Sequence, residues 1–474
     1  MSDPAHLDYS ADEMRAMLDA VSTRVVEHLA ALPSQPSCGN TDVDALCDAL
    51  REAAPDQPQA LAPLLDALFH DLIPRSYNTA GPGYLAFIPG GGLFPAALAD
   101  LIADTTNRYT GVRFAAPALV QLEANVLDWL RDWMQFPETT KGLLTTGGSM
   151  ANFNAIVCAR ESRLGADLRR GVMYVSSQSH HSVTRAARLA GIMPDRVRVI
   201  AVDEAFRMRV DSLASAVAAD RRAGLTPFAV ISSAGTTNTG AVDPLDAIAD
   251  LCKAERLWHH VDGAYGAFFH MCDELRPLLA GLPRADSLTL DPHKGLFLPY
   301  GTGALLVANG AVLRAAHDSE APYFPAGSAH QEFYDPHHYG PDLSRGFPGL
   351  RVWLTVKLFG AAKLRAAVAE KRALAVQLAA RVAQMPGFVM VAPPQLSLFA
   401  FHLTWPGATL EDENAATERL MTDTTARGRV MITGCRVDGR FLGRVCVLSF
   451  RTRQDRIDAC ADDLAASAAA ILPG

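Results

Sequence analysis

The sequence predicts an α/β protein with a mainly parallel seven-stranded sheet. Between about residues 140 and 310, short apolar runs alternate with helical stretches, a pattern typical of parallel strands joined by covering helices. Glycine and polar residues follow five of these runs directly, as expected at the carboxyl edge of such a sheet, where ligands bind. The chain of 474 residues is 49% hydrophobic and 20% charged, so it can bury a large core.

Seven segments have the composition of strands. They are residues 142–146, 172–176, 197–202, 228–233, 257–262, 287–290 and 303–308. Helical patterns separate most of them, so we expect helices on both faces of the sheet.

The flanking regions predict two further units. Residues 1–75 have the pattern of helices with proline-rich joints, and Ser10 and Glu13 have the spacing of a capping box. From residue 346 a long helix leads into a region with strands in "LSLFAFHLTW" and "GRVCVLSF". We therefore expect an N-terminal helical segment at 1–75, a large domain at 76–345 and a small C-terminal α+β domain at 346–474.

Charge and cysteine content limit the possible function. The net charge is −8, which argues against nucleic acid or an anionic membrane as a partner. Eight cysteines are scattered without a CxxC pair, a usage typical of reduced thiols in the cytoplasm. The N-terminus lacks the basic start and apolar core of a signal peptide, and prolines and glycines interrupt the most apolar stretch. We expect a cytoplasmic protein that acts on small molecules.

The segment "TTGGSMANFNAI" follows the first predicted strand. Gly147 and Gly148 allow close approach of the backbone, Ser149 offers a hydroxyl, and a helix follows at once. Backbone N–H groups at a helix N-terminus bind anions. A tight turn that happens to use two glycines is the alternative.

Three further residues carry chemistry at the same predicted edge. His180 follows the second strand, Asp262 ends the fifth and Lys294 follows the sixth. Strand alternation places Trp258, His260 and Asp262 on one face, with His259 on the other. A buried carboxylate needs a partner, which is a helix N-terminus, an arginine or a protonated ring nitrogen.

Lys294 is the most informative of these residues. A lysine in a desolvated pocket becomes a nucleophilic amine that forms Schiff bases with carbonyl compounds and pyridoxal phosphate. The alternative is a strand-end lysine whose ammonium reaches solvent. An amine, an anion cradle, a carboxylate and a group that covers a ring together meet the requirements of pyridoxal phosphate.

We expect no metal site. The pairs His259–His260 and His337–His338 could suggest one, but adjacent residues on a strand point to opposite faces. No cysteine or carboxylate lies at ligand spacing.

The motifs "TTGGSMAN", "SHHSV", "AGTTNTGAVDPL", "HVDGAYGAF" and "DPHKG", in this order, resemble those of the group II pyridoxal-phosphate-dependent amino-acid decarboxylases, the relatives of aromatic L-amino-acid decarboxylase. The resemblance covers about residues 75–370. It implies the aspartate-aminotransferase (type I) fold of the PLP-dependent transferases, with residues 76–345 as the domain that binds pyridoxal 5'-phosphate.

The resemblance also implies a role for each matching position. Lys294 is then the lysine that bonds to the cofactor aldehyde, Asp262 keeps the pyridine nitrogen protonated, and His180 stacks on the ring near the substrate carboxylate. His260 matches a histidine that supports this site. The remaining implied cofactor contacts are Gly147, Gly148, Ser149, Thr237, Ala264, Asp291 and His293.

A loop tyrosine and a homodimer complete what the resemblance implies. In the family a tyrosine on a loop, commonly from the partner subunit, supports protonation of the product. Tyr323 is the best match within residues 321–346 and Tyr334 the reserve. Shared active sites imply a homodimer, with residues 1–75 packing on the partner and residues 107–114 contributing across the interface.

The expected reaction is decarboxylation of an L-amino acid, with aromatic substrates favoured. Gly90, Gly91 and Gly92 stand where aromatic decarboxylases usually have larger pocket residues, which would widen or shift the pocket. The alternatives are oxidative deamination to an aldehyde, a non-aromatic substrate, or a catalytically silent relative that serves as a binding protein.

Overall fold

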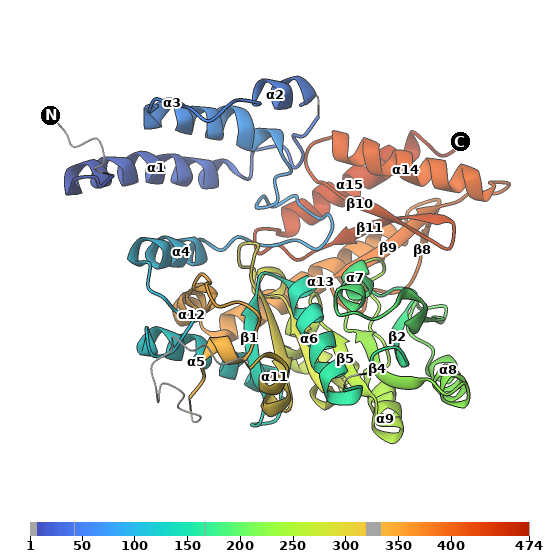
Figure 1. Ribbon diagram of the computed structural model, residues 1–474. Coiled ribbons are helices and arrows are strands. Elements are labelled where there is room, and N and C mark those ends of the chain that lie inside the picture. Colours follow the sequence, from blue (N-terminus) through green and yellow to red (C-terminus); the bar gives the residue numbers. More distant parts are fainter. Residues whose placement is uncertain (1–6, 42, 166, 319–332, 474) are drawn as a thin grey trace.

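Figure 1 shows a large body around one sheet, with a smaller sheet above it and a helical segment that extends to one side. The computed structural model describes residues 7–41, 43–165, 167–318 and 333–473. The large sheet has seven strands and the small sheet four. The type I fold with a mainly parallel sheet is confirmed, while the predicted domain boundaries at 75/76 and 345/346 stay a prediction.

The large sheet contains all seven predicted strands, with ends that differ by at most two residues. Its strands are β1 (Lys141–Thr145), β2 (Gly171–Ser176), β3 (Val197–Ile200), β4 (Thr226–Ser233), β5 (Trp258–Asp262), β6 (Ser287–Leu290) and β7 (Gly303–Val307). They lie in the order β1-β7-β6-β5-β4-β2-β3. Only β7 runs against the other strands. The carboxyl ends of β1, β2, β4, β5 and β6 therefore meet at one edge.

Helices cover both faces of this sheet, as alternate residues of β2 illustrate. Met173 and Val175 belong to the same core cluster as the apolar side of α6 (Gly148–Arg163). Val172 and Tyr174 pack instead with residues of α8 (Val210–Arg222) and α9 (Leu245–Glu255). The alternation of side chains along the strand produces these two separate layers.

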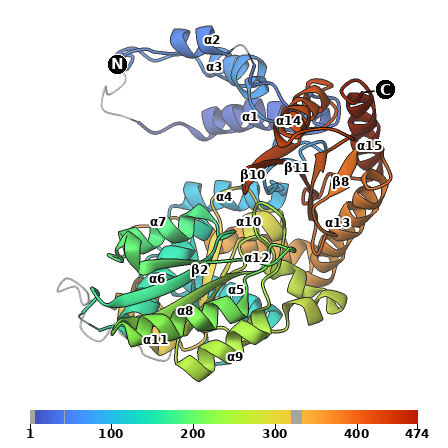
Figure 2. The same ribbon diagram turned by 90° about the vertical axis from the view of Figure 1, so that its right-hand side faces the viewer.

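The other helices of the large body lie around this sheet (Figure 2). They are α4 (Phe94–Thr106), α5 (Pro117–Trp133), α7 (His181–Leu189), α10 (Pro292–Gly295) and α11 (Gly310–His317). Short helical turns η3 (Pro194–Arg196), η4 (Ala267–Met271), η5 (Asp273–Leu275), η6 (Pro277–Leu279) and η7 (Leu282–Arg284) occupy the connections.

The long helix predicted from residue 346 is two helices. They are α12 (Pro348–Phe359) and α13 (Ala361–Val382), and Gly360 separates them. Gly360 has φ 74°, a left-handed conformation that ends the first helix and that glycine adopts without steric cost. The apolar pattern continues across the break, which is why the sequence predicts one helix.

The small sheet is antiparallel and packs on the last helices. Its strands β8 (Phe388–Met390), β9 (Leu398–Leu403), β10 (Thr433–Val437) and β11 (Arg440–Cys446) lie in the order β10-β11-β9-β8. Together with α13, α14 (Leu410–Ala426) and α15 (Gln454–Ala469), they enclose a separate apolar core. The two strands predicted from the sequence are β9 and β11.

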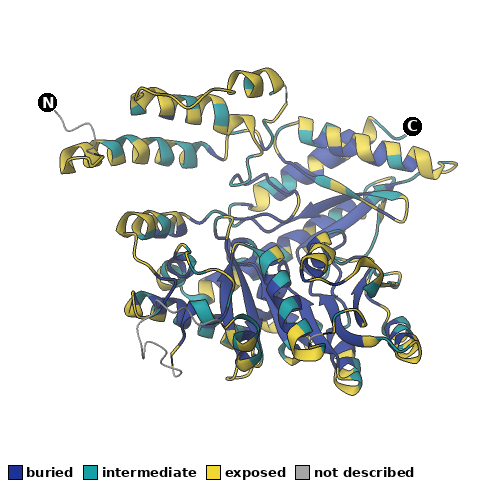
Figure 3. Cartoon of the chain, in the orientation of Figure 1, coloured by how far each residue is buried: buried dark blue, intermediate teal, exposed yellow. Residues whose placement is uncertain are grey.

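The N-terminal segment has little packing of its own. It consists of α1 (Ala11–Ala31), α2 (Asp44–Ala49), α3 (Leu61–Asp66), η1 (Ala67–Leu72) and η2 (Ile73–Arg75). The capping box of Ser10 and Glu13 is confirmed. No residue of α1 is buried, and Figure 3 shows this segment mostly exposed.

None of the described helices is both long enough and apolar enough to cross a bilayer.

Strand β5 buries two neighbouring histidines. His259 bonds through Nε2 to Ser232 Oγ at 2.8 Å, whereas His260 and Trp258 both contact Ser287 Oγ at 2.8 Å. The predicted alternation of faces is confirmed. Burial lowers the pKa of His259 to about 3 and that of His260 to about 4, because desolvation disfavours the charged imidazole.

These histidines predict a loss of stability in mild acid. Below the unfolded pKa of about 6.5 the unfolded chain binds protons that the folded chain does not, so stability falls as the pH drops toward 4. Each histidine adds a slope of up to about 1.4 kcal/mol per pH unit. In urea unfolding between pH 7 and 5, His259→Gln should show a shallower slope than the unchanged protein. Parallel slopes would contradict the burial of a neutral imidazole.

Candidate active site

A pocket lies at the carboxyl edge of the large sheet, and every predicted cofactor contact lines it. The lining residues come from the segments that follow β1, β2, β4, β5 and β6. They are Thr146, Gly147, Gly148, Ser149, Met150, Asn152, His180, Ser182, Ser233, Gly235, Thr236, Thr237, Asp262, Ala264, Tyr265, Asp291, His293 and Lys294. The sheet topology therefore brings together residues that are up to 148 positions apart, from Thr146 to Lys294.

One wall of the pocket is a glycine turn at the start of α6. Gly147 has φ 150° and precedes the helix, and no side chain caps its N-terminus. A Cβ at Gly148 would lie 3.0 Å from both Ala264 Cβ and Asp291 Oδ2, so a larger residue would intrude. The turn thus exposes backbone N–H groups of a helix N-terminus, which attract an anion.

Lys294 forms an ion pair with Asp291, the carboxylate that also lies beside this turn. Its Nζ lies 2.9 Å from Asp291 Oδ2, and its side chain is 23% exposed. The expectation of a desolvated lysine is therefore replaced by a lysine held by a carboxylate. Asp291 Oδ1 is buried and has no hydrogen-bond partner among the described residues. The geometry fixes the amine of Lys294 at the pocket wall.

His293 lies beside this pair in a fixed orientation. Its Nδ1 donates to the carbonyl oxygen of Thr302 at 2.7 Å, and its Nε2 is 3.7 Å from Asp291 Oδ2. Burial lowers the pKa of His293, which favours the neutral ring. Thr302 immediately precedes the antiparallel strand β7, so this strand helps to position the site.

Asp262 is anchored by two neutral donors. Asn152 Nδ2 donates to Asp262 Oδ2 at 2.9 Å, and the Ala264 N–H donates to Oδ1 at 3.2 Å. No lysine, arginine or histidine of the described chain forms an ion pair with Asp262. Two of the three partners expected for Asp262, a helix N-terminus and an arginine, are therefore not found among the described residues. The third, a protonated ring nitrogen of a ligand, is left.

Asn152 connects Asp262 to the buried histidine behind it. Its Oδ1 accepts from Thr289 Oγ1 at 2.8 Å and lies 3.0 Å from His260 Nε2. With the amide oxygen as acceptor, the neutral His260 ring carries its proton on Nε2 and accepts from Ser287 Oγ at Nδ1. Asn152 is a site residue that the sequence analysis missed, although it lies within the quoted "TTGGSMAN".

His180 is oriented by the start of α7. The Ser182 N–H donates to His180 Nδ1 at 3.3 Å, and Ser182 Oγ lies 2.8 Å from the same nitrogen. Nδ1 is therefore an acceptor, so the neutral ring carries its proton on Nε2. Burial lowers the pKa of His180 and outweighs the opposite effect of Asp262. Ser182 also accepts from Asn152 Nδ2 at 3.1 Å, which links His180 to Asp262.

A buried arginine of the small sheet supports the pocket from outside. Arg444 is 4% exposed. It donates to the carbonyl oxygens of Thr237 at 2.5 Å and Phe87 at 3.1 Å, and to Thr433 Oγ1 at 3.0 Å. The guanidinium thus connects β10 and β11 to the pocket segment of Thr237 and to the segment of Phe87. This role could not be predicted from the sequence, because Phe87 and Thr237 lie more than 200 residues away in the chain.

The glycines at 90 and 91 do not leave open space. A Cβ at Gly90 would lie 2.9 Å from the Tyr300 ring, and one at Gly91 would lie 2.6 Å from Phe297 Cβ and 2.8 Å from the Phe450 ring. Aromatic side chains therefore occupy the volume that larger residues would fill. Neither glycine lines the pocket of Lys294, so the expectation that they widen or shift it stays a prediction, and nothing lies within 4 Å of a Cβ at Gly92.

The two loop tyrosines have different outcomes. Tyr323 lies outside the described residues. Tyr334 is 8% exposed, and its ring stacks on Tyr339 with centroids 5.2 Å apart. Burial raises the pKa of Tyr334. It lines a second pocket beside Leu127 and Leu306 and is not among the residues that line the pocket of Lys294.

The prediction that His337 and His338 lie on a strand and point to opposite faces is wrong. These residues form a helical turn, η8 (Pro336–His338), and not a strand. Their rings lie on the same side with centroids 3.7 Å apart, and Asp335 lies within hydrogen-bond distance of His337.

The pocket residues fit pyridoxal phosphate. The uncapped N-terminus of α6 suits a phosphate, Lys294 suits an aldehyde, and the unpaired carboxylate of Asp262 suits a protonated ring nitrogen. His180, as a neutral ring held by Ser182, can stack on a planar ligand. Each requirement is met by a separate strand end, so no group serves two functions.

Comparisons with known proteins agree with this pocket. The pyridoxal-dependent decarboxylase conserved domain matches residues 44–404. An aromatic-L-amino-acid decarboxylase from Bacillus atrophaeus is 34% identical over 454 residues, which cover 95% of each chain. The crystal structure of an Oryza sativa TDC with PLP and tryptamine has a TM-score of 0.94 at 27% identity, covering 99% of this chain and 100% of that one.

A further solved structure supports the fold alone. It is the Rhodiola rosea 4-hydroxyphenylacetaldehyde synthase, which has a TM-score of 0.91 at 22% identity and covers 98% of this chain and 99% of its own.

Proposed function

The chain belongs to the pyridoxal-dependent decarboxylase family, and from this premise we propose that it decarboxylates an aromatic L-amino acid to the corresponding amine and carbon dioxide. As a member, it is a pyridoxal-phosphate-dependent carboxy-lyase. The convergence of Lys294, Asp262 and His180 on one pocket carries the proposal. Relatives named for aromatic L-amino acids and tryptophan support the substrate class.

In this proposal each part of the pocket would hold one part of the cofactor. The N-terminus of α6, with Gly148 and Ser149, would receive the phosphate, and Lys294 would supply the amine for the aldehyde. Asp262 would accept the N–H of the pyridine ring. When bound, pyridoxal phosphate supplies an electron sink for the electron pair that remains on the α-carbon as carbon dioxide leaves.

Asp262 performs its role because Asn152 and Ala264 fix it. Two neutral donors hold the carboxylate without neutralising its charge. A cation beside it is strongly favoured, because a buried carboxylate without a counter-charge is costly. We propose that this charge keeps the proton on the pyridine nitrogen throughout the reaction.

His180 covers the ring and orients the substrate. Its acceptor nitrogen is satisfied by Ser182, which leaves Nε2–H as the donor. A neutral donor binds the substrate carboxylate less strongly than a cation would. Because the negative charge leaves the carboxylate as carbon dioxide forms, weaker binding of that charge raises the barrier less. We therefore assign His180 to both ring stacking and substrate positioning.

The glycine segment does not carry the substrate class. Tyr300, Phe297 and Phe450 fill the space beside Gly90 and Gly91, and none of these five residues lines the pocket of Lys294. The aromatic substrate class therefore rests on the names of the relatives.

Product analysis tests the reaction and the substrate. Purified holoenzyme incubated with each proteinogenic L-amino acid should release amine and carbon dioxide in equal amounts from tryptophan, tyrosine or phenylalanine. Lys294→Ala should abolish both products and the cofactor absorbance band that shifts with amines, while the exposed-lysine control Lys363→Ala should keep them. Aldehyde with peroxide would establish the oxidative alternative, and turnover by Lys294→Ala would remove this lysine from the reaction.

We propose that Tyr323 supports protonation of the product α-carbon. Tyr334, the reserve, is stacked in the protein interior beside Glu123 and Arg345. That packing supports a structural role for Tyr334. The assignment of Tyr323 rests on its position in the family motif.

Paired variants separate the two tyrosines. Tyr323→Phe should reduce amine formation by at least tenfold, with aldehyde as the remaining product, because the proton donor is lost. Tyr334→Phe should retain most amine formation and change mainly the melting temperature. Mass spectrometry of the products checks both. A drop in amine formation with Tyr334→Phe alone would reverse the assignment.

We also propose a homodimer. Apolar side chains of α1 are exposed, among them Met14 at 49%, Leu18 at 51% and Val26 at 60%. In α4, Leu101 and Ile102 are 45% and 48% exposed. Several exposed apolar side chains on one pair of helices are typical of a protein interface, and these helices contain few buried residues of their own.

Light scattering after size-exclusion chromatography tests the dimer. The unchanged protein should elute with twice the chain mass of 50.8 kDa. The double variant Leu18→Asp/Val26→Asp should elute at one chain mass, because charges at a buried interface are costly. Leu410→Asp, at an exposed apolar residue of α14, is the control and should remain a dimer. A monomeric unchanged protein would exclude the proposal.

The cysteines support a reducing location. All eight lie among the described residues and are unpaired, and burial raises the pKa of Cys158, Cys446 and Cys460 to about 12. Such thiols are inert packing groups. We propose that the protein works in the cytoplasm.

A further inference from the structure

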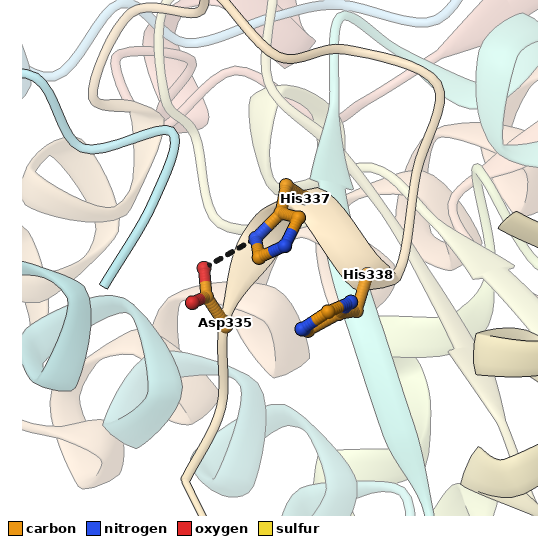
Figure 4. Close-up of side chains that lie close together, drawn as sticks. All are labelled: Asp335, His337 and His338. Carbon is orange, nitrogen blue, oxygen red and sulfur yellow. Dashed lines mark hydrogen bonds and ion pairs between the residues drawn. The ribbon is translucent and has the colours of Figure 1, made fainter. Parts of the chain in front are cut away.

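One carboxylate and two imidazoles lie together outside the pocket of Lys294. Asp335 is 5% exposed, and His337 and His338 follow it on the turn η8. Figure 4 shows the carboxylate pointing toward the ring of His337, with the ring of His338 beside it. One ligand atom from each residue lies within 4.8 Å of the other two.

The contacts of Asp335 hold this group in place. Its Oδ1 accepts from the Arg113 N–H at 2.9 Å and lies 2.8 Å from His337 Nδ1. The carboxylate is therefore fixed by a backbone donor from a segment more than 200 residues away in the chain. A fixed and largely buried carboxylate beside imidazoles is a pre-organised ligand and needs little ordering on binding.

A second carboxylate orients His338. Asp318, the residue that follows α11, lies with its Oδ1 2.5 Å from His338 Nδ1. A carboxylate at Nδ1 places the ring proton there and directs the Nε2 lone pair outward. Metal-binding histidines commonly have such a carboxylate behind them, which fixes the ring and raises its basicity.

We propose that Asp335, His337 and His338 bind a divalent transition-metal ion of the zinc class. Two imidazoles and one carboxylate are the donor set that Zn²⁺, Co²⁺ and Ni²⁺ prefer, whereas Mg²⁺ and Ca²⁺ prefer oxygen donors alone. Three protein ligands leave a coordination position for water.

The donor spacing allows binding after small side-chain rotations. Donor atoms on one tetrahedral zinc ion stand about 3.3 Å apart at metal–ligand distances of about 2.0–2.1 Å. The Asp335–His337 separation of 2.8 Å is already shorter than this, and the other separations within 4.8 Å close by side-chain torsion. The ion replaces hydrogen bonds within the cluster with stronger bonds to a single centre.

The bound ion would connect three segments, namely η8, the end of α11 through Asp318, and the segment of Arg113.

Cobalt titration tests the site directly. Tag-free holoenzyme treated with EDTA and dialysed is titrated with Co²⁺, with the visible d–d absorption and calorimetry as readouts that do not depend on activity. The expected result is one tightly bound ion per chain, displaced by Zn²⁺. His338→Gln should weaken binding by more than 100-fold, and Asp318→Asn by about 10–100-fold, as for other carboxylates that support a metal-bound histidine. His70→Gln, on η1, is the control and should bind as the unchanged protein does.

Folding of the variants is checked by circular dichroism and melting temperature. Asp335→Asn removes the carboxylate ligand and disturbs the contact with Arg113, so His338→Gln provides the independent test. The metal should raise the melting temperature of the unchanged protein and leave that of His338→Gln unaltered. Absence of Co²⁺ binding by the unchanged protein, or equal binding by folded His338→Gln, would overturn the proposal.

Discussion

The site depends on the need to satisfy a buried carboxylate at the end of β5. Asp262 is 9% exposed. Because burial removes most of the water around its carboxylate, the protein has to supply the hydrogen-bond donors. Asn152 meets this need from the second turn of α6. Because the same amide also contacts His260, Ser182 and Thr289, it uses every donor and acceptor that it has. The position of α6, and with it the glycine turn, is thereby tied to β5, β6 and the start of α7.

The small sheet extends this constraint to the rest of the chain. Arg444 is a buried cation that donates mainly to backbone carbonyls, and burial lowers its pKa. Carbonyl partners stabilise a guanidinium less than a carboxylate would, so the desolvation of Arg444 is only partly compensated. In return, its hydrogen bonds join three segments of the chain. Arg451 is similar, since it donates to the carbonyls of Ala80 and Gly91. Together the two arginines fix the segment that precedes α4 against the C-terminal region.

Sequence reasoning succeeded where the signal is local. The strands follow from short apolar runs between turn residues, and Ser10 with Glu13 follows from the spacing of a capping box. Lys294, Asp262 and His180 were predicted to meet because parallel strands end at one edge. Asn152 and Arg444 were missed because their roles depend on partners far away in the chain. The Asp335–His337–His338 group was missed because a turn was interpreted as a strand, and Gly360 because a helical pattern runs through its left-handed conformation.

The charges of the pocket define what it can accept. Lys294 and Asp291 neutralise each other, and burial lowers the pKa of both His180 and His293, so these rings are neutral. The carboxylate of Asp262 then remains without a counter-charge among the described residues of the pocket. A ligand that suits this arrangement carries its positive charge at Asp262 and its negative charge at the N-terminus of α6. A protonated pyridine ring with a phosphate at its other end has this distribution. A simple anion would leave Asp262 unpaired, and a simple cation would leave the helix N-terminus unsatisfied, so the pocket selects a ligand that has both.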